Sequence, residues 1–229
     1  MKFDEFRHID TWVFDLDNTL YPPEVRLFDQ IEQKMQFFIA DFLNVSLAKA
    51  DMLRAKYWIS HGTTLAGMME NHVMPPDEFL RNVHEINFSV LPSAQNLAQL
   101  ILALPGRKIV YTNGTEPYAR NVLAARGLEQ EFEAAYGIEH ASYQPKSRAE
   151  AFHEVFVRAK VPPDTATIFE DDLRNLKVPA HLGLKTIFIS AELIFPDYVD
   201  MAHSNLETFL SQLVTACFSD RFGSLDNRI

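Results

Sequence analysis

The chain has 229 residues, of which 47% are hydrophobic and 23% charged, an ordinary composition for one folded domain or one domain with an insertion. Its 21 basic and 31 acidic residues give a formal net charge of −10. Such an acidic chain is poorly suited to binding a nucleic-acid polymer or an anionic membrane, whereas a small anionic substrate needs only a few local cations.

The number of cysteines and the N-terminal sequence indicate the cellular compartment in which we expect the protein. Cys217 is the only cysteine, so no disulfide forms within the chain, as is typical of the reducing cytosol. The segment from Met1 to His8 has no apolar signal core, and no stretch approaches the roughly 20 apolar residues that span a bilayer. We therefore expect a cytoplasmic protein without a membrane partner, either a monomer or a homodimer.

Short apolar runs bounded by polar turns predict five buried strands. In chain order they are Thr11 to Phe14, Lys108 to Tyr111, Phe132 to Tyr136, Ala166 to Phe169 and Lys185 to Ile189, with the third the weakest. Helical patterns lie between the later runs, and this alternation is typical of a parallel sheet with helices on both faces. The predicted fold class is α/β, a Rossmann-like doubly wound parallel sheet.

The stretch of residues 21–90 contains no convincing strand. Apolar residues at helical spacing from Leu27 to Phe42 predict a long amphipathic helix, Ser46 is placed to cap a second helix through Tyr57, and Pro76 begins another. An all-helical block of about 70 residues is far longer than an ordinary connection. We predict an inserted helical cap at 21–90 and a core made of residues 1–20 and 91–229.

Polar residues follow the predicted strands at the edge where open α/β sheets bind ligands. They are Asp15 and Asp17, then Thr112, Asn113 and Gly114, then Lys146, and finally Glu170 and Asp171. Carboxylates that crowd together are costly unless a cation is bound, and an all-oxygen site with few protein ligands suits Mg²⁺. Asp15, Asp17, Glu170 and Asp171 are therefore the predicted metal site, with Mg²⁺ as the cofactor.

These residue types also suit phosphate chemistry. Of the two aspartates, one can attack phosphorus and form an aspartyl-phosphate, while the other protonates the leaving oxygen and later deprotonates water. Lys146 can neutralise the nucleophile and a phosphoryl oxygen together, Thr112 offers a hydroxyl, and Asn113-Gly114 offer backbone N–H donors. Taken singly, each has a plainer interpretation, because aspartates cap turns, Asn-Gly is a common turn pair and most lysines are solvated.

Four segments together resemble a known family. Phe-Asp-Leu-Asp-Asn-Thr-Leu-Tyr at 14–21, Tyr-Thr-Asn-Gly at 111–114, Pro-Lys at 145–146 and Phe-Glu-Asp-Asp at 169–172 resemble, in order, the four motifs of the haloacid dehalogenase-like (HAD) superfamily. The resemblance covers nearly the whole chain and implies a role for each matched residue. Asp15 is then the nucleophile and a metal ligand, Asp17 the general acid and base and a ligand through its carbonyl, Thr112 the phosphoryl-binding residue, Lys146 the charge balance, Asp171 a metal ligand and Glu170 a ligand through water.

The spacing between the motifs and the presence of Asp17 indicate which branch of the superfamily the chain resembles. The 95 positions from Asp17 to Thr112 leave room for a helical cap, whereas the 34 from Thr112 to Lys146 leave none for the other cap type of the family. The dehalogenase branch lacks an aspartate at the position of Asp17, so its presence here implies phosphate transfer.

The segment 57–68, Tyr-Trp-Ile-Ser-His-Gly-Thr-Thr-Leu-Ala-Gly-Met, together with 169–176, is similar to the pyrimidine 5′-nucleotidase branch. Ser147 and Asp172 depart from it, since proline and serine are common there. The similarity implies a pyrimidine nucleoside monophosphate as substrate. Expected substrate contacts are His61, Thr63 and Thr64 in the cap with Thr112, Asn113, Gly114 and Lys146 in the core, although Thr63 or Thr64 can instead cap the next helix.

Two other functions stay open. One is a HAD phosphatase or phosphomutase acting on a sugar phosphate or another small phosphorylated metabolite. The other is a catalytically silent protein that binds a phosphometabolite. Loss of Asp15, Asp17 or Lys146 would favour the silent protein, and all three are present.

Overall fold

The computed structural model describes residues 3–192 and 194–218. The strands are β1 (Thr11–Phe14), β2 (Arg107–Tyr111), β3 (Ala134–Tyr136), β4 (Ala166–Glu170), β5 (Lys185–Ile189) and β6 (Met201–His203). They form one sheet in the order β3-β2-β1-β4-β5-β6, and every neighbouring pair is parallel. The predicted parallel α/β sheet is confirmed. The sequence did not indicate β6, because this three-residue edge strand buries none of its residues.

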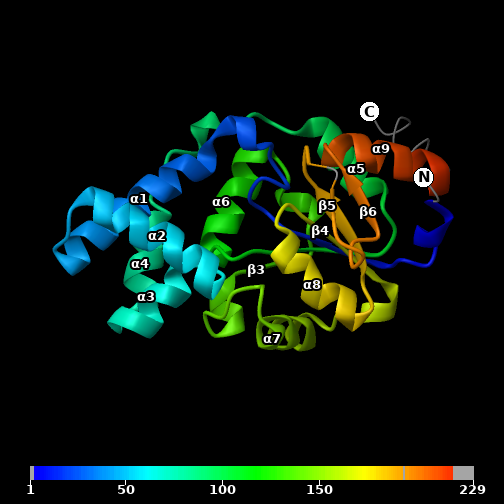
Figure 1. The fold of residues 1–229 in the computed structure, drawn as a ribbon. Coiled ribbons are helices and arrows are strands. Elements are labelled where there is room, and N and C mark those ends of the chain that lie inside the picture. The colour runs from blue at the N-terminus through cyan, green and yellow to red at the C-terminus, as the bar shows by residue number, and fades with distance from the viewer. Residues whose placement is uncertain (1–2, 193, 219–229) are drawn as a thin grey trace.

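Helices cover both faces of the sheet (Figure 1). One face carries α5 (Gln95–Ala103), α6 (Glu116–Arg126) and α9 (Leu206–Cys217), and the other carries α7 (Ala149–Ala159) and α8 (Leu173–Leu182). The central strand explains this arrangement, since successive side chains of a strand point to opposite faces. Trp12 and Phe14 belong to the core cluster under α5, α6 and α9, whereas Val13 belongs to the cluster under α7 and α8.

Of the five α-helices between β1 and β2, the first four lie together beside the sheet, at the left of Figure 1. They are α1 (Leu27–Leu43), α2 (Leu47–His61), α3 (Thr64–His72) and α4 (Pro76–Val83). Ser46 caps α2 by accepting a hydrogen bond from Lys49 N at 3.3 Å, as predicted. Thr63 caps α3 in the same way, with its Oγ1 3.1 Å from Ala66 N. We call these four helices the cap helices.

One buried arginine ties together both connections between the cap helices and the sheet. Arg126, at the end of α6, donates from Nε to the carbonyl oxygen of Leu20 at 3.2 Å and from Nη1 to that of Pro92 at 2.6 Å. Leu20 follows β1 and Pro92 precedes α5, so the guanidinium fixes the entry and the exit of the helical insertion against the core.

The cap helices contact the segment that leads into α7 directly. Gly62, in the turn between α2 and α3, has φ +86°, and a Cβ there would lie 2.2 Å from Ser147 Oγ and 3.1 Å from Pro145 Cγ. Both the backbone angle and this close approach require glycine. Arg148 of the core also pairs with Glu70 of α3 at 2.6 Å.

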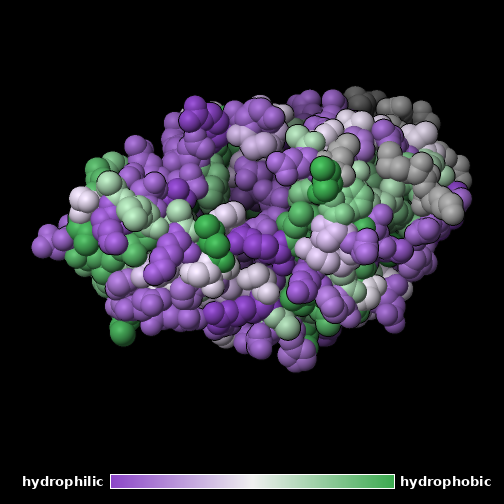
Figure 2. All heavy atoms as spheres, viewed as in Figure 1, coloured by the Kyte–Doolittle hydropathy of each residue, from purple (hydrophilic) through white to green (hydrophobic). Residues whose placement is uncertain are grey.

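On the outside of the molecule, hydrophilic side chains gather in the depression between the cap helices and the sheet (Figure 2). Within the described residues, no helix combines the length and the apolar character needed to cross a membrane.

Candidate active site

The centre of the site is a buried lysine held between two carboxylates. Lys146 Nζ lies 2.5 Å from Asp15 Oδ1 and 2.5 Å from Glu170 Oε2, and it also donates to the carbonyl oxygen of Tyr111 at 3.1 Å. Asp15 follows β1, Glu170 ends β4 and Tyr111 ends β2, so three adjacent strands converge on one ammonium. Burial lowers the pKa of Lys146, but the charges of Asp15 and Glu170 outweigh it and raise the pKa above the usual value. The lysine is therefore a permanent cation.

Three carboxylates lie close enough to hold one metal ion. Asp15, Glu170 and Asp171 each offer an oxygen, and these oxygens lie within 4.8 Å of one another. Burial, and then the charge of Asp15, raise the pKa of Glu170 to about 7, and burial with the charges of Asp15 and Glu170 raises that of Asp171 well above its usual range. One lysine cannot neutralise three acids. An all-oxygen donor set with surplus negative charge fits a hard divalent cation such as Mg²⁺.

Asp17 lies at the same edge and is held by two phenols. Its Oδ1 accepts a hydrogen bond from Tyr21 Oη at 2.7 Å and from Tyr118 Oη at 2.5 Å. Burial and the nearby charge of Asp15 raise the pKa of Asp17 to about 6, although both phenols oppose the shift. A carboxyl group with a pKa near neutrality can both give and take a proton under physiological conditions.

The loop after β2 offers hydrogen-bond donors. Thr112 is buried, and its Oγ1 accepts from Gly114 N at 2.9 Å, which leaves the hydroxyl hydrogen for another acceptor. Asn113 Oδ1 accepts from Lys146 N at 2.9 Å and so joins this loop to the lysine. Within the described chain, the side-chain NH₂ and the backbone N–H of Asn113 donate to no other residue. These groups point to the loop as an anion-binding element.

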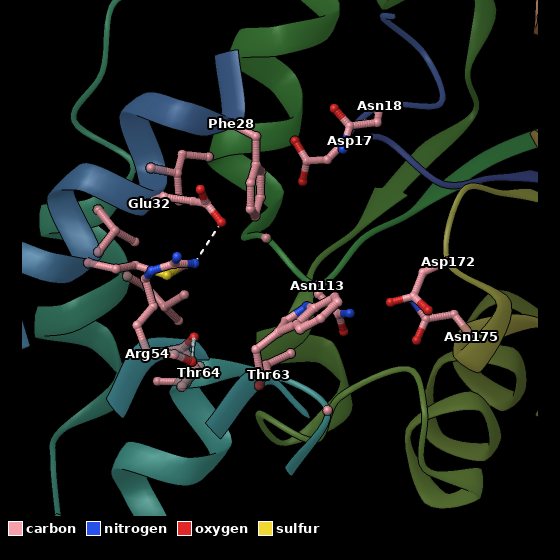
Figure 3. Close-up of a pocket in the computed structure, with 18 of the residues that line it drawn as sticks. Asp17, Asn18, Phe28, Glu32, Arg54, Thr63, Thr64, Asn113, Asp172 and Asn175 are labelled. Atoms are coloured by element: carbon pink, nitrogen blue, oxygen red, sulfur yellow. Dashed lines mark hydrogen bonds and ion pairs between the residues drawn. The ribbon is translucent and has the colours of Figure 1, made fainter. Parts of the chain in front are cut away.

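A cavity of about 500 Å³ opens above these residues and runs into the cap helices. On the core side it is lined by Asp15, Asp17, Asn18, Asn113, Gly114, Glu170, Asp171, Asp172 and Asn175. On the cap side its lining is mostly apolar and includes Phe28, Ile31, Met35, Leu65, Phe79, Leu80 and Val83. Figure 3 shows Phe28, Glu32 and Arg54 across the cavity from Asn113, Asp172 and Asn175.

The structure brings most of the predicted residues to this cavity, with different degrees of access. Asp15, Asp17, Asn113, Gly114, Glu170 and Asp171 line it, while Thr112 and Lys146 lie just beneath and are 1% exposed. Among the cap residues, Thr63 and Thr64 line the cavity. Their hydroxyls are already engaged, because Thr63 caps α3 and Thr64 Oγ1 donates to Arg54 O at 3.1 Å.

His61 lies outside the lining. Its ring nitrogens contact Ser60 Oγ at 2.7 Å and Asn71 Nδ2 at 3.3 Å, and its Nε2 lies 3.5 Å from Glu70. These contacts are made within the cap helices, so they account for the ring without a ligand.

Sequence reasoning assigned no role to Tyr21, Tyr118 and Arg174, which contact residues of the site. Tyr21 lies one helical turn after Asp17 in the first motif, so its position was readable, but Tyr118 approaches only through the packing of α6. Arg174 stacks on Trp58, with its guanidinium carbon 3.8 Å from the ring centroid, and donates to Trp58 O at 2.8 Å. Asn175 donates to Glu170 Oε1 at 3.3 Å and so supports the carboxylate.

No family model matches the chain, but many solved structures share its fold. It is similar to the HAD-hydrolase YfnB from Bacillus subtilis bound to magnesium (18% identity, TM-score 0.60, covering 90% of this chain and 98% of that one). It is also similar to CbbY from Rhodobacter sphaeroides in complex with xylulose-(1,5)-bisphosphate (15% identity, TM-score 0.63, covering 87% of this chain and 95% of that one). A third similar structure is the L-2-haloacid dehalogenase from Xanthobacter autotrophicus (12% identity, TM-score 0.55, covering 90% of this chain and 98% of that one). The fold is thus that of HAD-like hydrolases, and proteins with this fold differ in chemistry.

Proposed function

We propose that this chain is a magnesium-dependent phosphomonoester hydrolase of the HAD superfamily that acts through an aspartyl-phosphate on Asp15. The observation that carries the proposal is the meeting of Asp15, Lys146, Glu170 and Asp171 at the carboxyl edge of the sheet. Asp17 lies beside them with a raised pKa. Lys146 partly neutralises the crowded carboxylates, and the same positive charge would favour the approach of an anionic phosphate to Asp15.

The proposed reaction has two steps, in which the aspartyl-phosphate forms and is then hydrolysed. A carboxylate oxygen of Asp15 attacks phosphorus, the bond from phosphorus to the leaving oxygen breaks, and protonated Asp17 gives that oxygen its proton. Asp17 then removes a proton from water, the water oxygen attacks phosphorus, and the bond from phosphorus to Asp15 breaks. Inorganic phosphate leaves and both aspartates return to their starting states.

Other residues of the site bind and orient the phosphoryl group. In the proposal, Lys146 balances its charge, while Thr112, Asn113 and the Gly114 loop donate hydrogen bonds to it. Asp15, Glu170 and Asp171, together with the backbone carbonyl of Asp17, would hold Mg²⁺. When bound, the ion supplies positive charge that neutralises the crowded carboxylates and draws electrons from the phosphoryl oxygens.

For the substrate, we propose a pyrimidine nucleoside 5′-monophosphate. The proposed cap at 21–90 supplies one wall of the cavity and therefore selects the leaving group, while the proposed core of residues 1–20 and 91–229 performs the chemistry. Support comes from the sequence similarity of the cap and from the apolar character of the cap side of the cavity, which suits a flat base. Thr63 and Thr64 remain proposed substrate contacts, and His61 remains a prediction.

A panel of monophosphates tests this proposal. With Mg²⁺ present, we expect kcat/KM to be higher for UMP or CMP than for purine nucleotides, hexose phosphates and phosphoglycolate, measured as phosphate release. A preference for sugar phosphates over every nucleotide would overturn the nucleotidase assignment and leave the phosphatase assignment standing. No turnover of any ester, including aryl phosphates, would favour a silent binding protein.

A sugar phosphate is the second candidate substrate. CbbY shares the fold and its structure holds a sugar bisphosphate. A phosphatase or phosphomutase of this type would need polar partners for several hydroxyl groups. The polar side chains on the cap side of the cavity are Glu32, Arg54, Thr63, Thr64 and His84, and both threonine hydroxyls are already engaged. The rest of this wall is apolar, and for this reason we rank the sugar phosphate second.

A further inference from the structure

The cap side of the cavity holds one ion pair among apolar side chains. Glu32 of α1 and Arg54 of α2 both line the cavity, with Glu32 Oε1 2.6 Å from Arg54 Nη1. Figure 3 shows this pair beside Phe28, facing the core side of the cavity. Phe28, Ile31 and Met35 form the apolar wall next to it.

Each member of the pair keeps an unused polar atom. Arg54 Nε donates to Asp51 Oδ1 at 2.9 Å, and Nη1 donates to Glu32 Oε1. Within the described residues, Arg54 Nη2 and Glu32 Oε2 have no hydrogen-bond partner. A pair that served only to join α1 to α2 would not need to face a cavity. The wall therefore presents a donor and an acceptor side by side.

We infer that Glu32 and Arg54 determine which leaving group the site accepts, because they form hydrogen bonds with the edge of a ring that carries an acceptor next to a donor. Arg54 donates to a ring carbonyl oxygen or ring nitrogen, and Glu32 accepts from the neighbouring ring N–H or amino group. The apolar wall around the pair covers the faces of the same flat heterocycle. This inference rests on the proposed function and names the residues that recognise the base.

The chemistry of the wall argues against a leaving group whose hydroxyl groups would reach this wall. In a nucleoside 5′-monophosphate the ribose lies between the phosphate and the base, so the base is the part that would meet the wall. Hydroxyl groups spread around a sugar would meet Phe28, Ile31 and Met35, and a buried hydroxyl without a partner costs about 1–3 kcal/mol. A flat ring with polar atoms on one edge avoids this cost, because its faces are apolar and its edge meets the ion pair.

Paired substitutions test the inference without leaving a buried charge unpaired, because Asp51, which also loses Arg54 as a partner, is half exposed. In Glu32→Met/Arg54→Met, both side chains keep their approximate length and lose their hydrogen-bonding groups. The probes are UMP, which has such an edge, and phenyl phosphate, which is flat but has none. We expect kcat/KM for UMP to fall about 100-fold, and that for phenyl phosphate to stay within about twofold, since a hydrogen-bonding site discriminates strongly against what it cannot pair.

A matched control is a second ion pair, which joins α1 to the segment just after α4. Lys34 Nζ and Glu85 Oε2 lie 3.8 Å apart and neither residue lines the cavity. The variant Lys34→Met/Glu85→Met should hydrolyse both probes as the wild type does. Turnover of phenyl phosphate also shows that each variant is folded.

The outcomes separate the two proposals. If Glu32→Met/Arg54→Met keeps wild-type kcat/KM for UMP, or loses it equally for both probes, the pair is structural and the inference is wrong while the nucleotidase function stands. If the wild type cleaves phenyl phosphate but no nucleoside monophosphate, the proposed function itself fails, and the inference fails with it.

Discussion

Tyr118 donates its phenolic hydrogen to Asp17, with Oη and Oδ1 2.5 Å apart, although 101 positions separate the two residues in the chain. The ring of His84, which follows α4, stacks on Tyr118 with a centroid distance of 4.4 Å. A single tyrosine of α6 thus connects the cap helices to the proposed general acid. The contact suggests that cap position and the orientation of Asp17 depend on each other.

Replacing Tyr118 by phenylalanine should weaken proton donation by Asp17. We expect kcat/KM for a nucleoside or alkyl phosphate to fall about tenfold, because a hydrogen bond to a charged group contributes about 1.5–3 kcal/mol. For 4-nitrophenyl phosphate the loss should be smaller, since its leaving group needs little protonation. The control is Tyr198→Phe, whose hydroxyl donates to Leu173 O at 3.2 Å, away from Asp17. Equal losses on both substrates would contradict this role.

His84 should make stability depend on pH. Burial lowers the pKa of His84 to about 4, below the roughly 6.5 of an unfolded chain. The contribution of the buried neutral imidazole to the free energy of unfolding is therefore fully present above about pH 6.5. It is lost as the pH falls towards 4, because the unfolded chain binds the proton more readily. Between pH 7.5 and 5 the wild type should lose about 2 kcal/mol more free energy of unfolding than His84→Phe, measured with denaturant. Parallel pH curves for the two proteins would show the prediction to be wrong.

The close approach of Gly62 to Ser147 and Pro145 should be needed for activity, in addition to any effect that it has on stability. Gly62→Ala places a Cβ against Ser147 and Pro145, while Gly183→Ala imposes a similar angle, φ +98°, with no contact closer than 3.5 Å. Both variants should lose about 1 kcal/mol of stability from the left-handed backbone, but only Gly62→Ala should lose tenfold or more in kcat/KM.

A second substitution checks that the Gly62 effect comes from the contact. Adding Ser147→Ala to Gly62→Ala removes the Oγ that would lie 2.2 Å from the new Cβ. The double variant should recover part of the lost activity. No recovery, together with an equal loss in Gly183→Ala, would mean that backbone strain alone explains the result.

Magnesium should stabilise the protein as well as activate it. Asp15, Glu170 and Asp171 crowd together, so a bound divalent cation should raise the melting temperature, and its removal by EDTA should lower it. Asp171→Asn should melt above the metal-free wild type, because one of three crowded carboxylates is gone, and should respond little to Mg²⁺. A wild-type melting temperature unaffected by Mg²⁺ would contradict the assigned ligands.

Much of the fold was readable because its signals are local. Buried parallel strands such as Thr11–Phe14 and Lys185–Ile189 are continuous apolar runs, and their observed bounds match the prediction. Capping residues such as Ser46 are local as well. By contrast, β6 pairs at the sheet edge without burying a side chain, so its residues give no periodic signal.

The site residues that lie within the sequence motifs could be predicted from the sequence. Asp15, Lys146 and Glu170 were predicted to converge from strand ends, and they lie in direct contact. The Glu32–Arg54 pair was not predicted, because it depends on how α1 and α2 pack, and charged residues on amphipathic helices usually face solvent.

The most direct test of the account compares the wild type with Asp15→Asn in phosphate release from a panel of monophosphates with Mg²⁺. The account predicts release by the wild type, none above background by the variant, and a mass increase of one phosphoryl group on the wild-type chain when turnover is stopped rapidly. If Asp15→Asn releases phosphate as fast as the wild type, Asp15 is not the nucleophile and the proposed mechanism is wrong.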